Sequence, residues 1–136
     1  MRNDLEYIKL CESLGTQAAA KGNQAVGAII TKGNEIISEA EEATKSKNDI
    51  TCHAEIETIR AAVSKLKTND LSDCVLYSTH EPCIMCSYAI RFYGIKKVVY
   101  LHAAKDFGGV SSSMPLLTTA DVPNHWPVAP VIIQLE

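Results

Sequence analysis

Apolar residues recur every three or four positions over residues 4–21, which is the spacing of one face of an α-helix. The apolar stripe of this predicted helix comprises Leu5, Ile8, Cys11, Leu14 and Ala18. Gly22 and Asn23 follow it as a stop signal. Two runs rich in Val and Ile then flank a Lys-Gly-Asn tip, and this pattern predicts a β-hairpin over residues 25–40.

Alternating helical and strand patterns fill the middle of the chain. The polar stretch at 41–49 predicts a loop, and helical spacing returns over residues 52–66. A short apolar run at 73–79 predicts a strand, residues 83–94 predict a helix that ends in glycine, and residues 96–102 predict the next strand. Strand, helix and strand in this order predict a crossover between parallel neighbours.

The last third of the chain is less regular. A Gly/Ser-rich loop at 103–117 leads into a short helix or turn, and residues 128–136 predict a final strand, which Pro130 places at a sheet edge. We therefore expect an α/β protein with a three-layer α-β-α fold, in which a mixed five-stranded sheet carries helices on both faces. No linker or repeat interrupts the pattern, so we expect residues 1–136 to form a single domain.

Composition and charge narrow the classes of partner. Apolar residues make up 46% and charged residues 21%, which excludes disordered, collagen-like and coiled-coil chains. The formal net charge of −3 gives no general attraction to nucleic acid or to an anionic membrane. Residues 2–15 lack the apolar core of a signal peptide, and no window reaches the length of a membrane-spanning helix. We therefore expect a cytoplasmic protein without membrane association.

Reactive side chains concentrate at the starts of two predicted helices. In a reducing compartment, the spacing of Cys83 and Cys86 indicates metal or redox chemistry more often than a disulfide, and the two residues share one helix face. His53 and Glu55 begin the other helix, and helix N-termini gather at one end of such a sheet. One imidazole and two thiolates would leave the fourth position of a tetrahedral zinc to water, with Glu55 free to take a proton. Cys52 is either a further ligand or a small buried residue.

These residues resemble a known family. His-Ala-Glu at 53–55 and Pro-Cys-Ile-Met-Cys at 82–86 are similar to the His-x-Glu…Pro-Cys-x-x-Cys signature of the zinc-dependent cytidine/deoxycytidylate deaminase superfamily. The resemblance runs from AVGAII through YSTHEPCIMCSYAI to VVYLHAAKDFGG. Within the superfamily, the chain is most similar to the branch of guanine deaminase, fungal cytosine deaminase and the tRNA adenosine deaminases.

The resemblance implies a zinc-dependent hydrolytic deaminase, a hydrolase acting on the C–N bonds of cyclic amidines, with one Zn²⁺ per subunit. His53, Cys83 and Cys86 would be the zinc ligands, and Glu55 would be the catalytic proton shuttle. Zinc-bound hydroxide would attack the ring carbon that bears an exocyclic amine, and ammonia would leave. The backbone N–H groups of Ala54 and Cys83 would help to hold the oxygen atoms at this carbon. The substrate would be a nucleobase, a nucleoside or a related small amino-heterocycle.

One departure from the resembled branch lies eleven residues before the predicted zinc histidine, where those enzymes carry a base-binding asparagine and this chain has Glu42. A carboxylate only accepts hydrogen bonds, so we expect Glu42 to bind a substrate edge with adjacent N–H donors, unless it is a solvated loop residue. His80 is a candidate pocket residue or a hydrogen-bonded strand end, and Phe107 either stacks on the base or packs in the core. Loops around 23–26, 40–50 and 102–112 would shape the choice of substrate.

A second departure concerns the partner. The sequence stops after VIIQLE, where tRNA deaminases continue into a basic helix, and the net charge is negative. From these two features we expect a small-molecule substrate and no tRNA partner. The alternatives are a tRNA adenosine deaminase or a non-catalytic zinc-binding module for a partner, and intact Glu55 favours an enzyme over the module. The resemblance also implies a homodimer.

Overall fold

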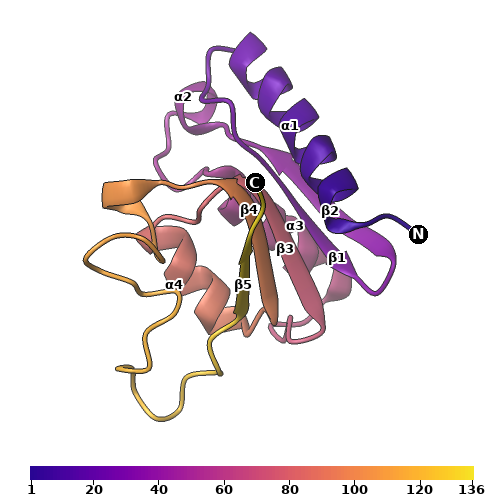
Figure 1. Cartoon of the computed structure of the whole chain (residues 1–136). Helices are drawn as coiled ribbons and strands as arrows, with labels where there is room; N and C mark the ends of the chain where they lie inside the picture. Colours follow the sequence, from indigo (N-terminus) through magenta and orange to yellow (C-terminus); the bar gives the residue numbers. More distant parts are fainter.

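The computed structural model describes residues 1–136 and contains one five-stranded sheet of strand order β2-β1-β3-β4-β5 (Figure 1). Its strands are β1 (Gly27–Lys32), β2 (Glu35–Glu41), β3 (Cys74–His80), β4 (Lys97–His102) and β5 (Val131–Gln134). Strand β1 is antiparallel to both β2 and β3, whereas β3, β4 and β5 run parallel. The predicted mixed five-stranded sheet is confirmed, and β5 lies at its edge, directly after Pro130.

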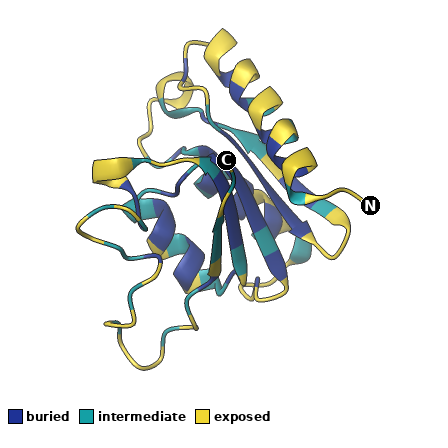
Figure 2. Ribbon diagram, in the orientation of Figure 1, coloured by how far each residue is buried: buried dark blue, intermediate teal, exposed yellow.

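Helices cover both faces of this sheet, as the sequence predicts. Helix α1 (Asp4–Ala20) packs on one face, while α3 (Ala54–Leu66) and α4 (Ile84–Tyr93) lie on the other (Figure 1). Successive strand residues point to opposite faces of the sheet. Ile29 therefore packs in the hydrophobic cluster between the sheet and α1, and its neighbour Ile30 packs in the larger hydrophobic cluster between the sheet and helices α3 and α4. Figure 2 shows the buried residues on the sheet and on the inward faces of the helices.

Helix α1 approaches the start of β1 backbone to backbone. The first turn of α1 is fixed by a capping box, in which the Glu6 N–H donates to Asn3 Oδ1 at 2.9 Å. Further along, a Cβ on Gly27 would lie 2.1 Å from the carbonyl oxygen of Cys11, and a Cβ on Gly15 would lie 2.9 Å from that of Ala25. Only glycine permits this contact, which positions the segment before β1.

The predicted loops differ from the structure in detail. The polar stretch at 41–49 contains a one-turn helix, α2 (Thr44–Lys47), and the loop after β4 contains a single 3₁₀ turn, η1 (Lys105–Phe107). The long connection from β4 to β5 runs past α4, where the buried guanidinium of Arg91 donates to the carbonyl oxygens of Leu116 and Thr119 at 3.0 Å. No helix combines the length and the apolar character needed to cross a bilayer.

Candidate active site

The reactive side chains meet where helices α3 and α4 begin. His53 is the residue immediately before α3, and Cys83 is the residue immediately before α4. Both have extended backbones, and the sulfur of Cys83 accepts a hydrogen bond from the Cys86 N–H at 3.5 Å, as an N-cap side chain does. Glu55 and Cys86 lie within the first turns. His53 and Cys83, which are 30 residues apart in sequence, thus lie together where the two helices begin.

Three of these side chains form a cluster with metal-site geometry. Nδ1 of His53 lies 3.5 Å from Sγ of Cys83 and 3.6 Å from Sγ of Cys86, and all three candidate ligand atoms lie within 4.8 Å of one another. A tetrahedral zinc with Zn–S bonds of about 2.3 Å and Zn–N bonds of about 2.05 Å separates nitrogen from sulfur by about 3.6 Å. The three residues therefore fit zinc in both donor type and spacing, and Cys52 is not part of the cluster.

The electrostatics of the two thiols also suit a cation. Hydrogen bonds from the Cys86 thiol and from His53 lower the pKa of Cys83 to about 4, whereas donation to Cys83 and burial raise the pKa of Cys86. Cys83 thus favours the thiolate form, while its neighbour Cys86 keeps its proton. A metal ion in the same position would replace that proton and bind both sulfurs as thiolates.

Glu55 lies beside the cluster but outside it. Its side chain is 4% exposed, and its Oε2 accepts a hydrogen bond from Ser78 Oγ at 3.3 Å. Burial raises the pKa of Glu55 to about 7. A carboxyl group with such a pKa can both take up and release a proton near neutral pH, which is what a general acid–base catalyst requires.

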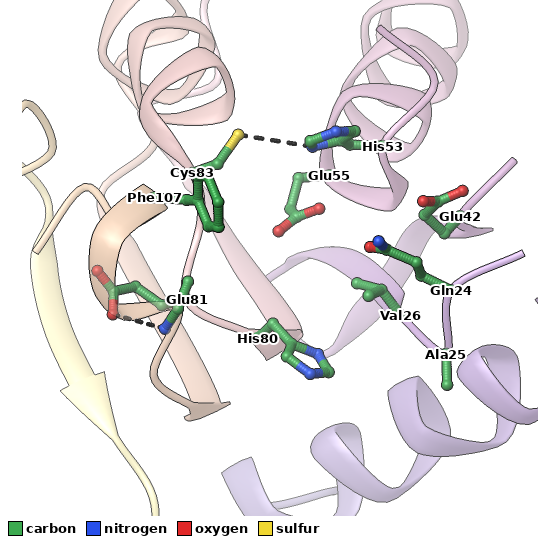
Figure 3. Close-up of a pocket in the computed structure, with 11 residues that line it drawn as sticks. Gln24, Ala25, Val26, Glu42, His53, Glu55, His80, Glu81, Cys83 and Phe107 are labelled. Carbon is green, nitrogen blue, oxygen red and sulfur yellow. Dashed lines mark hydrogen bonds between the residues drawn. The ribbon is translucent and has the colours of Figure 1, made fainter. Parts of the chain in front are cut away.

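A cavity of about 450 Å³ opens over these groups (Figure 3). Its lining includes five of the predicted site residues besides Glu55: Glu42, His53, His80, Cys83 and Phe107. Cys86 and Ala54 do not line it, because both are fully buried. The three loops expected to shape the pocket all contribute, since the lining also contains residues 24–26 and Ala104.

The remaining predicted residues of the lining have distinct surroundings. Glu42 is 3% exposed and accepts hydrogen bonds from the Thr44 N–H at 2.7 Å and the Thr44 hydroxyl at 3.0 Å, so it is not a solvated loop residue. Nδ1 of His80 pairs with the hydroxyl of Thr79 at 2.8 Å, and burial, followed by the nearby His102, lowers the pKa of His80. Phe107 is 71% exposed, so the core-packing alternative is wrong.

One lining residue had no role in the sequence prediction. Glu81 precedes the Pro-Cys pair and is 2% exposed, with its carboxylate bound by the loop after β4. The sequence signal was an acidic residue directly before the Pro-Cys pair. Nothing in the local pattern links it to a loop more than twenty residues later.

Comparison with known proteins identifies relatives over most of the chain. A tRNA-specific adenosine deaminase of Aquifex aeolicus is 42% identical over 111 residues, which cover 82% of this chain and 74% of that protein. A guanine deaminase of Bacillus subtilis is 43% identical over 99 residues, which cover 72% of this chain and 64% of that protein. A solved structure from a study of A-to-I editing by tRNA:A34 deaminases has a TM-score of 0.88 at 27% identity, and the match covers 96% of this chain and 98% of that one.

These relatives correct one expectation. We expected no tRNA partner from the negative net charge and the final residues, and the similarity to several tRNA-specific adenosine deaminases contradicts this. The reasoning failed because a net charge sums over the whole surface and does not describe the potential around one pocket. The last residues of a given sequence are equally poor evidence, because function has to be argued from the residues of the site.

A match to a family model includes the whole metal cluster. The model for the cytidine and deoxycytidylate deaminase zinc-binding region matches residues 1–102, which include all three candidate ligands and Glu55. The related tRNA adenosine and guanine deaminases are hydrolases of C–N bonds. The chain therefore belongs to the cytidine and deoxycytidylate deaminase family and is a zinc-dependent deaminase.

Proposed function

We propose that this protein replaces an exocyclic ring amine by a carbonyl in a tRNA adenosine, with release of ammonia. The proposed substrate rests on the 42% identity to a tRNA-specific adenosine deaminase over 82% of the chain. The match to the tRNA:A34 deaminase structure over 96% of the chain supports the same substrate. This was the alternative reading of the sequence, and the relatives favour it over a small-molecule substrate.

The residues of the site have separate parts in this proposal. His53, Cys83 and Cys86 would hold the zinc, which when bound lowers the pKa of a water so that it can attack near neutral pH. Glu55 takes one proton of the attacking water and passes it to a ring nitrogen. It then takes the proton of the hydroxyl group now on the ring carbon and gives it to the amine, which leaves as ammonia while the hydroxyl becomes the carbonyl. The pKa of about 7 of Glu55, raised by burial, suits both directions of transfer.

The size of the cavity restricts the form of the substrate. A volume of about 450 Å³ holds one base or nucleoside. A base paired and stacked in a duplex cannot reach such a site, so the target adenosine would lie in an unpaired loop and turn outward. Phe107, exposed at the edge of the cavity, offers a face on which that base can stack.

A second candidate is a free base such as guanine, and Glu42 favours it. The carboxylate of Glu42 is buried in the cavity wall, and Thr44 is its only hydrogen-bond donor there. A carboxylate suits a ring edge with adjacent N–H donors, which guanine has and adenine lacks. The similarity to a guanine deaminase agrees with this reading.

Ammonia release from a substrate panel tests both candidates. Zinc-loaded protein is given tRNA, adenosine, guanine, cytosine, a pterin and a triazine, with Glu55→Ala as the inactive control. Inosine formation in tRNA, with binding that weakens as salt rises, supports the first candidate. Salt-insensitive turnover of a free base alone supports the second. Zinc-loaded protein that releases no ammonia from any substrate would instead indicate a zinc-binding module for a partner.

The variant Glu42→Asn tests whether Glu42 selects the substrate. If Glu42 binds donor groups, this change should move the preference from bases with adjacent N–H donors toward bases that also offer acceptors. Glu41→Gln is the matched control, because Glu41 forms an ion pair with Lys21 and does not line the cavity over the metal cluster. An unchanged preference in Glu42→Asn would remove Glu42 from substrate recognition.

Two further expectations stay predictions. A homodimer, implied by the family resemblance, is tested by light scattering of the zinc-loaded protein. The expectation that residues 1–136 form a single deaminase domain is tested by whether the chain unfolds in one cooperative transition.

A further inference from the structure

The cavity wall that carries Phe107 belongs to a loop with little regular structure. Between the end of β4 and the connection past α4, residues 103–111 contain only the single turn η1. Lys105 in this turn has a φ of +51°, in the left-handed region that non-glycine residues rarely adopt. Such a conformation persists only where surrounding contacts impose it.

The carboxylate of Glu81 accepts hydrogen bonds from residues on both sides of this turn. Its Oε1 accepts from the Ala104 N–H at 3.1 Å and from the Ser111 hydroxyl at 2.6 Å, and its Oε2 accepts from the Val110 and Ser111 N–H groups, both at 2.8 Å. The donors lie at the two ends of the loop, so one side chain closes it. Figure 3 shows this carboxylate pointing away from Glu55.

Glu81 has no cationic partner. It is 2% exposed, and none of the four ion pairs in the structure includes it. A buried carboxylate has lost its hydrogen bonds to water and needs other donors. For Glu81, all of these donors belong to the loop. The loop and the carboxylate are therefore mutually dependent: each satisfies groups that the other would leave unpaired.

The same loop is attached to the segment that contains the metal ligand. The Gly109 N–H donates to the Pro82 carbonyl oxygen at 2.8 Å, and Gly108 forms an isolated bridge with Cys83. Gly108 has an ordinary φ of −75°, but a Cβ there would lie 1.8 Å from Oε2 of Glu81. Glycine is needed at this position because the carboxylate occupies the space of a side chain.

We propose that Glu81 is a positioning residue, which fixes the Phe107 wall of the cavity relative to the metal ligand Cys83. Glu81 acts through the loop and does not touch the reacting atoms. The inference rests on the proposed deaminase function for its effect on substrate binding, whereas the attachment of the loop can be measured without any substrate.

The test is Glu81→Gln, whose amide nitrogen would face N–H donors that need an acceptor. We expect KM to rise about tenfold, within the range for losing one base–aromatic stack, while kcat changes by less than about threefold. Zinc content should stay at one per chain. Ser111→Ala, which removes only one of the four hydrogen bonds, should raise KM less, and the exposed Ser113, which makes no side-chain hydrogen bond, supplies the control Ser113→Ala.

A double-mutant cycle shows whether Glu81 acts through Phe107. If it does, Glu81→Gln combined with Phe107→Ala should have the KM of Phe107→Ala alone. Additive effects of the two changes would overturn the proposal. Loss of zinc from Glu81→Gln would also overturn it, since Glu81 would then support the metal ligands rather than the loop.

Hydrogen exchange separates this proposal from the proposed function. In Glu81→Gln, the amides of Val110 and Ser111 should exchange at least about tenfold faster, because their acceptor is lost, while amides in the middle of α3 keep their rates. If Glu81→Gln does not fold, Ser111→Ala, which removes only the hydroxyl bond to Oε1 and leaves both amides their acceptor, should accelerate exchange at the same two amides by a smaller factor. Unchanged exchange at these amides would overturn the proposal. A wild-type protein inactive on every substrate would refute the deaminase function, while the exchange result would still decide the role of Glu81.

Discussion

Removal of zinc should lower the thermal stability of this protein by a predictable amount. The ligands come from the starts of two separate helices, α3 and α4, so the ion binds the folded chain and not the unfolded one. At free zinc about a hundredfold above its Kd, such binding adds about 2.7 kcal/mol to the free energy of unfolding. The entropy of unfolding of 136 residues is about 0.3 kcal/mol/K, so the melting temperature should fall by about 9 °C.

Calorimetry of zinc-loaded and chelator-treated protein measures this difference, with the Kd and stoichiometry taken from a zinc titration. Cys86→Ser should abolish the zinc-dependent shift, because the remaining two ligands bind weakly. Cys52→Ser is the matched control: Cys52 is buried next to a ligand but lies outside the cluster, so this variant should keep the full shift. A wild-type melting temperature that chelation leaves unchanged, with no zinc bound in the titration, would refute the assignment of the metal centre.

Three further changes test other parts of the molecule. Glu55→Gln should keep one zinc per chain and lower kcat by about 10²- to 10⁴-fold, and a rate near that of the wild type would rule out Glu55 as the proton shuttle. Phe107→Ala should weaken substrate binding by about 1–3 kcal/mol, read from KM, and an unchanged KM would show that no base stacks there. Arg91→Met should reduce the free energy of unfolding in urea by about 2–4 kcal/mol, because two partly buried carbonyl groups lose their donor, and a loss below about 0.5 kcal/mol would contradict this account.

The sequence predicted the parts of the site that depend on local pattern. The helical and strand periods placed His53 and Cys83 at the starts of α3 and α4, and the order of the elements placed those starts together. The structure moved both residues only slightly, from the first turn to the position before it. The fold was predictable for the same reason, since every strand and long helix carries an apolar pattern of its own.

Features that depend on contacts distant in sequence were not predictable. Glu81 occurs in polar surroundings along the chain, yet it is buried, because backbone donors from residues 104, 110 and 111 surround its carboxylate. Glu42 is also buried, although its only donor, Thr44, is two residues away, because it lies in a cavity wall formed by segments distant in sequence. The exposure of Phe107 is a similar case. Its neighbours in sequence permit either a core or a surface position, and the loop bound by Glu81 decides between them.

The close packing of α1 against the start of β1 limits how this pocket can be engineered. Helix α1 lies on the opposite face of the sheet from α3 and α4, but its backbone contact at Gly15 and Gly27 holds the segment 24–26 that forms one cavity wall. A library that seeks new substrates should therefore vary Gln24 and Val26 while both glycines stay fixed. A miniaturised version of the protein that omits α1 would retain every metal ligand and still lose the shape of its binding pocket.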